Sequence, residues 1–87
     1  MVVVKSYKYP GEENLKDLMA KQIGACEGNV IYLGTIRAHQ LSDIYHIDNT
    51  IGLVGLKEIS FVAMSEDEAK KAKKTIDTLL NTELMKI

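Results

Sequence analysis

Two histidines, an arginine and an aspartate lie close together in the middle of the chain, and their side chains suit an anion or metal site. Arg37 and His39 end one strand-like run, while His46 and Asp48 belong to the next. If a hairpin pairs His39 with Ile44, Arg37 faces His46 on one side of the sheet. A guanidinium group binds phosphate or carboxylate with two hydrogen bonds, and two imidazoles with a carboxylate are acceptable zinc ligands. Arg37, His39 and His46 are therefore the candidate residues for an anion site.

The same register separates polar from apolar residues, which supports it because a one-residue slip would mix the two sets. It puts Thr35 opposite Asp48 on the polar face. The opposite face then holds Val30, Tyr32, Ile36, Ala38, Tyr45 and Ile47. A solvated sheet face with ordinary cross-strand pairs is the competing interpretation, and we favour it over a ligand site.

Acidic residues gather at two places, and hard cations such as calcium require carboxylate ligands. The candidate metal-ligating residues are Glu12, Glu13, Asp48, Glu66, Asp67 and Glu68. Both clusters also fall where helices should start, and carboxylates are favoured there by the helix dipole and by capping without any ligand. The spacing of an EF-hand loop does not occur. Calcium is the possible cofactor that this pattern suggests, and a structural role is the favoured explanation.

Three other features have ordinary structural explanations. Cys26 falls on the apolar stripe of a helix and is expected to be a small buried residue rather than a nucleophile. The segment from Gly52 to Gly55 lacks the Gly-Lys-Ser/Thr ending of a phosphate loop and suits a hairpin or a strand bend. The lysines at 70–74 follow the acidic residues by one turn, as on a solvated helix face.

The strongest local signal is at Ser65 to Glu68, where a strand-like run ends and a helix starts. Ser65 and Glu68 fit a capping box, in which the hydroxyl accepts from the third helical N–H and the glutamate reaches back to the cap. Apolar residues then recur every three or four positions, at Ala69, Ala72, Ile76, Leu79 and Leu80. This pattern predicts an amphipathic helix to about residue 80.

The remaining elements follow from periodicity and turn residues. We expect a strand at 2–9, a helix at 12–26, a strand at 30–39, a connection at 40–43, a return strand at 44–48, a turn at 48–52 and a last strand at 53–64. The run at 30–39 is apolar on both faces at its start, which suits a central strand. The predicted fold is therefore α+β, a two-layer βαβββα domain over residues 1–87. Its sheet is four-stranded and mostly antiparallel, with two helices on one face.

Composition excludes several classes of protein. The 87 residues are 46% hydrophobic and 26% charged, as in an ordinary globular domain. A net charge of -1 gives no general attraction to nucleic acid or anionic lipid. The single cysteine excludes an internal disulfide framework and favours a cytoplasmic location. The apolar run at 2–4 is too short for a signal peptide or a membrane span, so we expect no membrane association.

The segment from Val30 to Arg37 resembles the phenylalanine-x-glycine-x-valine-arginine strand of the large subunit of molybdopterin synthase, and the resemblance extends over about residues 28–80. Only Arg37 matches a functional residue of that family, so the resemblance does not imply sulfur transfer. The length, element order and acidic helix starts also resemble small uncharacterised α+β proteins of methanogenic archaea, one of which is described as calcium-binding.

These observations favour a small cytoplasmic binding or accessory module without catalysis, which recognises a protein partner or itself. The first strand supports self-association, because Val2 and Val4 point to one side and Val3, Tyr7 and Tyr9 to the other, so both sides need cover. The alternative is a calcium-binding or small-anion-binding protein. An enzyme is the third hypothesis.

Overall fold

The computed structural model describes residues 2–23, 29–37 and 41–87 of the chain. These residues form two helices and one antiparallel sheet, which confirms the predicted α+β class. The elements are β1 (Val3–Lys8), α1 (Leu15–Ile23), β2 (Val30–Arg37), β3 (Leu41–Ile47), β4 (Thr50–Val54), β5 (Glu58–Ala63), α2 (Glu66–Leu80) and β6 (Met85–Lys86). The strand order is β2-β3-β4-β5-β1-β6, so the described sheet has six strands and the predicted number of four is wrong.

One extra strand arises because the expected strand at 53–64 is two strands, β4 and β5. The turn between them is closed by a 2.8 Å hydrogen bond from the backbone N–H of Gly55 to the carbonyl of Glu58. Gly52, expected in a turn, lies inside β4 and pairs with Tyr45 and Phe61. A Cβ on Gly52 would come within 2.6 Å of the Ile47 side chain, so the glycine permits close packing rather than a chain reversal.

The other extra strand is β6, which follows α2. It pairs with the end of β1, at Tyr7 and Lys8.

The hairpin of β2 and β3 has a register different from the predicted one. Arg37 pairs with Leu41 and Thr35 with Asp43, so the predicted pairings of Arg37 with His46 and of Thr35 with Asp48 are wrong. Residues 41–43, expected in the connection, belong to β3. The predicted partner pair of His39 and Ile44 involves residues 38–40, which lie outside the described part of the chain.

A β-bulge explains why the face assignment fails along this hairpin. The register shifts between Tyr32 and Gly34, and Gly34 has a φ of 143°, a backbone conformation that suits glycine. An extra residue in one strand exchanges the faces of every residue beyond it. Tyr32 therefore shares a face with Tyr45 as expected, whereas Ile36 lies on the opposite face.

The strand β2 is at an edge of the sheet, so its predicted central position is wrong. Ile31, Tyr32, Leu33 and Ile36 are all exposed. Burial within the described part of the chain therefore does not account for the apolar residues on both faces of this run.

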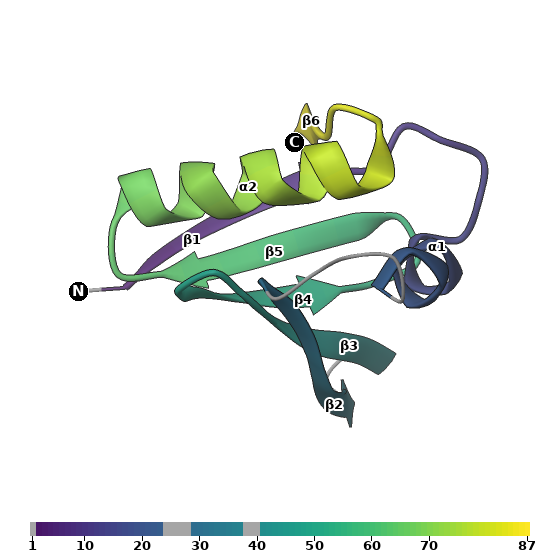
Figure 1. Ribbon diagram of the computed structural model, residues 1–87, viewed down its shortest axis with the longest axis horizontal. Helices are drawn as coiled ribbons and strands as arrows, with labels where there is room; N and C mark the ends of the chain where they lie inside the picture. The colour runs from purple at the N-terminus through teal and green to yellow at the C-terminus, as the bar shows by residue number, and fades with distance from the viewer. Residues whose placement is uncertain (1, 24–28, 38–40) are drawn as a thin grey trace.

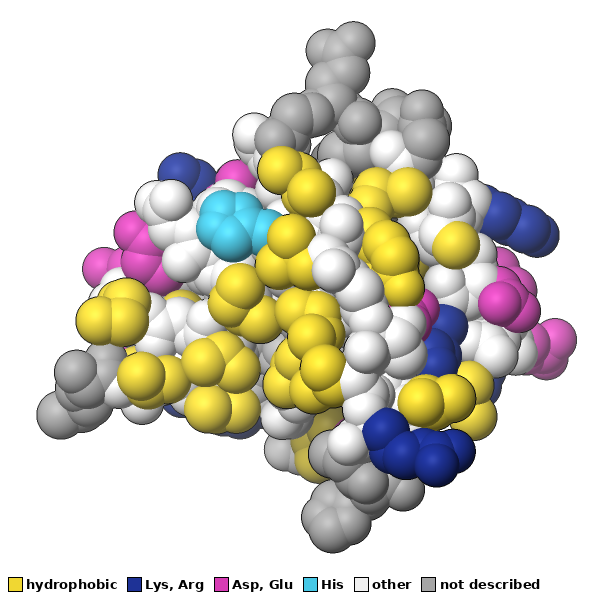
Figure 2. Space-filling view, turned by 90° about the horizontal axis from the view of Figure 1, so that it is seen from below, with side chains coloured by type: hydrophobic (Ala, Val, Ile, Leu, Met, Phe, Trp, Pro, Cys, Tyr) yellow, Lys and Arg dark blue, Asp and Glu magenta, His cyan; other side chains and the backbone are white. Residues whose placement is uncertain are grey.

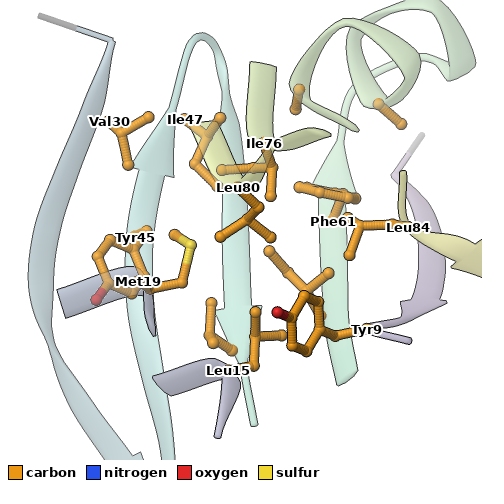
Figure 3. Close-up of a cluster of buried hydrophobic side chains, with 14 of the residues drawn as sticks. Tyr9, Leu15, Met19, Val30, Tyr45, Ile47, Phe61, Ile76, Leu80 and Leu84 are labelled. Atoms are coloured by element: carbon orange, nitrogen blue, oxygen red, sulfur yellow. The ribbon is translucent and has the colours of Figure 1, made fainter. Parts of the chain in front are cut away.

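Both helices contribute to one core on one face of the sheet (Figure 3). The helix α2 crosses over β1 and β5 (Figure 1), while Leu15 and Met19 of α1 are fully buried in the same cluster. The sheet contributes residues that share one face in the observed register: Val30, Tyr45, Ile47, Val54, Ile59, Phe61 and Ala63.

Local capping residues set the start of each helix. Ser65 is extended, and its hydroxyl accepts from the backbone N–H of Glu68 at 3.2 Å, which confirms the serine half of the predicted capping box. The first helix starts at Leu15 rather than at residue 12, because the Asn14 side chain accepts from the backbone N–H of Lys16 at 2.9 Å. No helix in the described residues is both long and apolar enough to cross a membrane.

Candidate functional site

The strand register divides the side chains of the sheet into a face covered by the helices and a face that no described helix covers. In β5, Ile59, Phe61 and Ala63 are buried towards the helices, as the alternation in the sequence predicts. Residues on the other side of the same strand, such as Ser60 and Val62, point away from the helices. The pairing carries this division from strand to strand across the sheet.

We call this second side the open face. In the five adjacent strands from β2 to β1, its apolar side chains are Val4 of β1, Ile31 and Ile36 of β2, Ile44 of β3, Ile51 and Leu53 of β4, and Val62 of β5. Met85 of the short strand β6 pairs with Lys8 and lies on the same face. The polar and charged residues of the open face are Ser6, Lys8, Ser42, His46, Glu58 and Ser60. Figure 2, which views the molecule from below, shows hydrophobic side chains gathered over the middle of this surface.

The open face is apolar and nearly uncharged. Val4 is 59% exposed and Ile31 is 53% exposed, whereas Ile51 and Leu53 are half-buried between their neighbours in the sheet. Isolated apolar residues are common on protein surfaces, but a contiguous apolar patch marks an interaction site. The arrangement therefore suits contact with another apolar surface.

Sequence reasoning identified only part of this surface. The alternation in β1 placed Val4 on a side that needs cover, but Ile51 and Leu53 were assigned to a turn and to the start of a long strand. The signal was the apolar run of Ile51, Leu53 and Val54, which continues through Gly52. This signal was missed because Gly52 was interpreted as a turn residue.

On the side of the sheet that carries the core, the hairpin of β2 and β3 holds a chain of polar contacts. The hydroxyls of Tyr32 and Thr35 are 2.8 Å apart, and Thr35 donates to Asp43 at 3.0 Å. The ammonium group of Lys16 lies 4.0 Å from the same carboxylate, which links α1 to the hairpin. Burial first, and then the negative charge of Asp43, raise the pKa of the Tyr45 phenol. These contacts hold the hairpin in place and leave the open face free.

The three candidates for an anion site do not converge among the described residues. Arg37 pairs with Leu41 on the side of the sheet that carries the core. His46 pairs with Ile31 and Ile51 and lies on the open face. Arg37 and His46 are therefore on opposite faces of the sheet, and His39 lies outside the described residues. Binding of an anion at either residue stays a prediction.

Of the two acidic residues before α1, Glu13 contacts Tyr9, which follows β1, and Lys57, which lies between β4 and β5. Glu13 accepts a 3.1 Å hydrogen bond from the Tyr9 hydroxyl, and its carbonyl accepts from Lys57 at 2.9 Å. Burial first, and then this hydrogen bond, raise the pKa of the Tyr9 phenol. Glu12 is exposed. Both glutamates precede the helix instead of forming its first turn.

The acidic residues at the start of α2 have different surroundings. Glu66 pairs with Lys5 of β1 at 2.8 Å, and the hydrogen bond from Lys5 lowers the pKa of this carboxyl. Asp67 is exposed. One oxygen of Glu68, Oε2, is buried without a hydrogen-bond partner. The cap therefore rests on the hydrogen bond that Ser65 accepts.

Asp48 lies in the turn between β3 and β4 with a φ of 54° and accepts from the Thr75 hydroxyl of α2 at 2.7 Å. Over residues 2–23, 29–37 and 41–87, no group of three or more His, Cys, Asp and Glu side chains has the arrangement of a metal site. The assignment of these carboxylates to calcium stays a prediction.

Comparison of the chain with protein-family models, with curated proteins and with solved structures gives no match. The resemblances to the molybdopterin synthase large subunit and to small archaeal α+β proteins stay predictions. The function of the protein is therefore inferred from the chain's own surfaces.

Proposed function

We propose that this protein is a non-catalytic interaction module that binds a protein partner through the open face. The observation that carries the proposal is the contiguous apolar patch over five strands, on the side of the sheet that no described helix covers. An antiparallel sheet commonly exposes one face to water, but that face is then mostly polar. In this protein seven apolar side chains occupy the positions where polar ones are expected.

The charge of the open face supports a protein partner over a nucleic acid. A nucleic-acid surface needs clustered lysine and arginine side chains to neutralise phosphates. The open face carries one lysine, Lys8, and its cross-strand neighbour is Glu58. We further propose a cytoplasmic location, for which the single cysteine of the sequence is the support.

Substitutions that add charge to exposed positions of the open face test the proposal. The variants are Val4→Glu and Ile31→Glu, and the matched control is Leu41→Glu, which changes a residue of similar exposure on the opposite side of the sheet. Each tagged variant is isolated from the native cells, and co-purifying proteins are identified by mass spectrometry. A partner identified in this way is then purified and titrated with each variant by calorimetry.

We expect the wild type and Leu41→Glu to bind the same identified partner, and both open-face variants to bind it at least about tenfold more weakly, because a charge is desolvated without a partner. Equal binding by all four proteins would contradict the proposal.

A further inference from the structure

We infer that the open face is occupied by a second copy of this chain, packed sheet against sheet about a two-fold axis. The inference rests on the proposed function, because it names the partner at the same face. Three features of the face support a second copy: its size, its charge and its position relative to the edge of the sheet.

The size of the open face matches what a dimer needs. Five strands spaced about 4.8 Å apart, each contributing about six residues at about 3.3 Å, cover about 24 by 20 Å in plan. The molecule itself measures 32 × 30 × 24 Å along its principal axes, so the open face spans most of one side. The accessible area of such a corrugated layer exceeds its area in plan. It approaches the roughly 600–1,000 Å² that each partner contributes to a specific interface of standard size.

The charge distribution allows the face to pack against its own copy. In a two-fold contact the same patch occurs on both sides, so a patch with net charge repels itself. The two charged residues of the open face, Lys8 and Glu58, have opposite signs and are cross-strand partners at one end. The middle holds Ile51, Leu53 and Val62. Interfaces of homodimers are richer in apolar area than other interfaces, which this composition fits.

The sheet order also favours face packing over pairing of two β2 edges. The strand β4 is the middle one of the five that form the patch. If the two-fold axis passes near Leu53, the second copy therefore covers the patch evenly on both sides of β4. The free edge of β2 is interrupted by the bulge between Tyr32 and Gly34. Bulges on edge strands twist the edge and disrupt the regular hydrogen-bonding row that a second strand would need.

Sedimentation equilibrium of the purified full chain from about 5 to about 500 µM tests the inference, since mass action shifts the monomer–dimer balance over such a range. The variants are again Val4→Glu and Ile31→Glu, with Leu41→Glu as control. All three positions are exposed, at 59%, 53% and 49%, so each variant is expected to fold, and circular dichroism verifies this.

We expect the wild type and Leu41→Glu to reach twice the 9.7 kDa chain mass. Both open-face variants should raise the dimer dissociation constant at least about tenfold, because each buries two unpaired carboxylates by symmetry. A monomeric wild type at the highest concentration would overturn the inference. So would a dimer weakened by Ile31→Glu and Leu41→Glu but not by Val4→Glu, which would indicate edge pairing of β2.

The two proposals fail in different ways. A wild type that is monomeric, yet loses an identified partner through Val4→Glu and Ile31→Glu, overturns the second copy and retains the interaction module. Variants that change neither self-association nor partner binding overturn both.

Discussion

Replacing Ser65 with alanine should lower the free energy of unfolding by about 1 kcal/mol, because it removes the acceptor that caps α2. The backbone at Ser65 is extended, with φ −154° and ψ 163°, and the hydroxyl accepts from the N–H of Glu68 at 3.2 Å. Alanine has no acceptor, so this N–H loses its side-chain partner at a half-buried position. Because the cap rests on one hydrogen bond, the cost should be near the middle of the usual range of about 0.5–2 kcal/mol.

Urea unfolding at one fixed protein concentration measures this difference, since a dimer would make stability depend on concentration. For a domain of this size, 1 kcal/mol corresponds to a fall in Tm of about 4–8 °C. Ser65→Asn retains an acceptor and should stay within about 0.3 kcal/mol of the wild type, because asparagine caps as well as serine. Thr78→Ala, an exposed change in the last turn of the same helix, should not destabilise it. If Ser65→Ala and Ser65→Asn both have the same free energy of unfolding as the wild type, the capping argument is refuted.

Three further predictions concern the core, the tyrosines and the hairpin. Gly11→Ala should destabilise the protein by at least about 1 kcal/mol in the same urea assay, because a Cβ on Gly11 would overlap the buried ring of Tyr9. The contribution of Tyr9 and Tyr45 to stability should be constant from neutral pH to about pH 9 and fall as the pH rises past 10.0, the ordinary tyrosine pKa, since the folded state raises the pKa of both phenols and the unfolded chain ionises first. Urea melts at alkaline pH measure this loss, and a curve that rises with pH would contradict it. Millimolar phosphate should leave the NMR signals of the His46 ring where they are in chloride at equal pH and ionic strength, because Arg37 lies on the other face of the sheet; a change specific to phosphate would count against this reasoning.

The features that could be predicted from the sequence are those fixed by neighbours in the chain. The cap at Ser65 and the apolar stripe of α2 depend on residues within one or two turns, and both are as predicted. The alternation of Ile59 and Phe61 against Ser60 also holds, because a strand imposes it over a few residues. The α+β class follows from such local periodicities.

The register of the β2–β3 hairpin could not be predicted, because it depends on where the connection falls and on a single extra residue in β2. The bulge between Tyr32 and Gly34 exchanges the two faces for the rest of β2. Separation of polar and apolar residues was the criterion for the predicted register. It misled because one face of this hairpin is apolar without being part of the core. The Arg37 and His46 constellation is lost because β3 starts at Leu41, inside the expected connection, so that Arg37 pairs with Leu41 and lies on the face opposite to His46.

The prediction of a central position for β2 failed in a way that bears on function. A run with apolar residues on both faces indicates a strand that is covered on both sides. In the described chain the core side of β2 meets Tyr45 and Ile47, but Ile31 on the other side is 53% exposed. The sequence pattern and the exposure of Ile31 are reconciled if the missing cover comes from another molecule. The same reasoning applies to Val4 at the far side of the open face, four strands away in the sheet order. Because β1 and β2 are so far apart, no local cause makes both Val4 and Ile31 apolar and exposed. One partner surface packed across the whole open face would account for both residues.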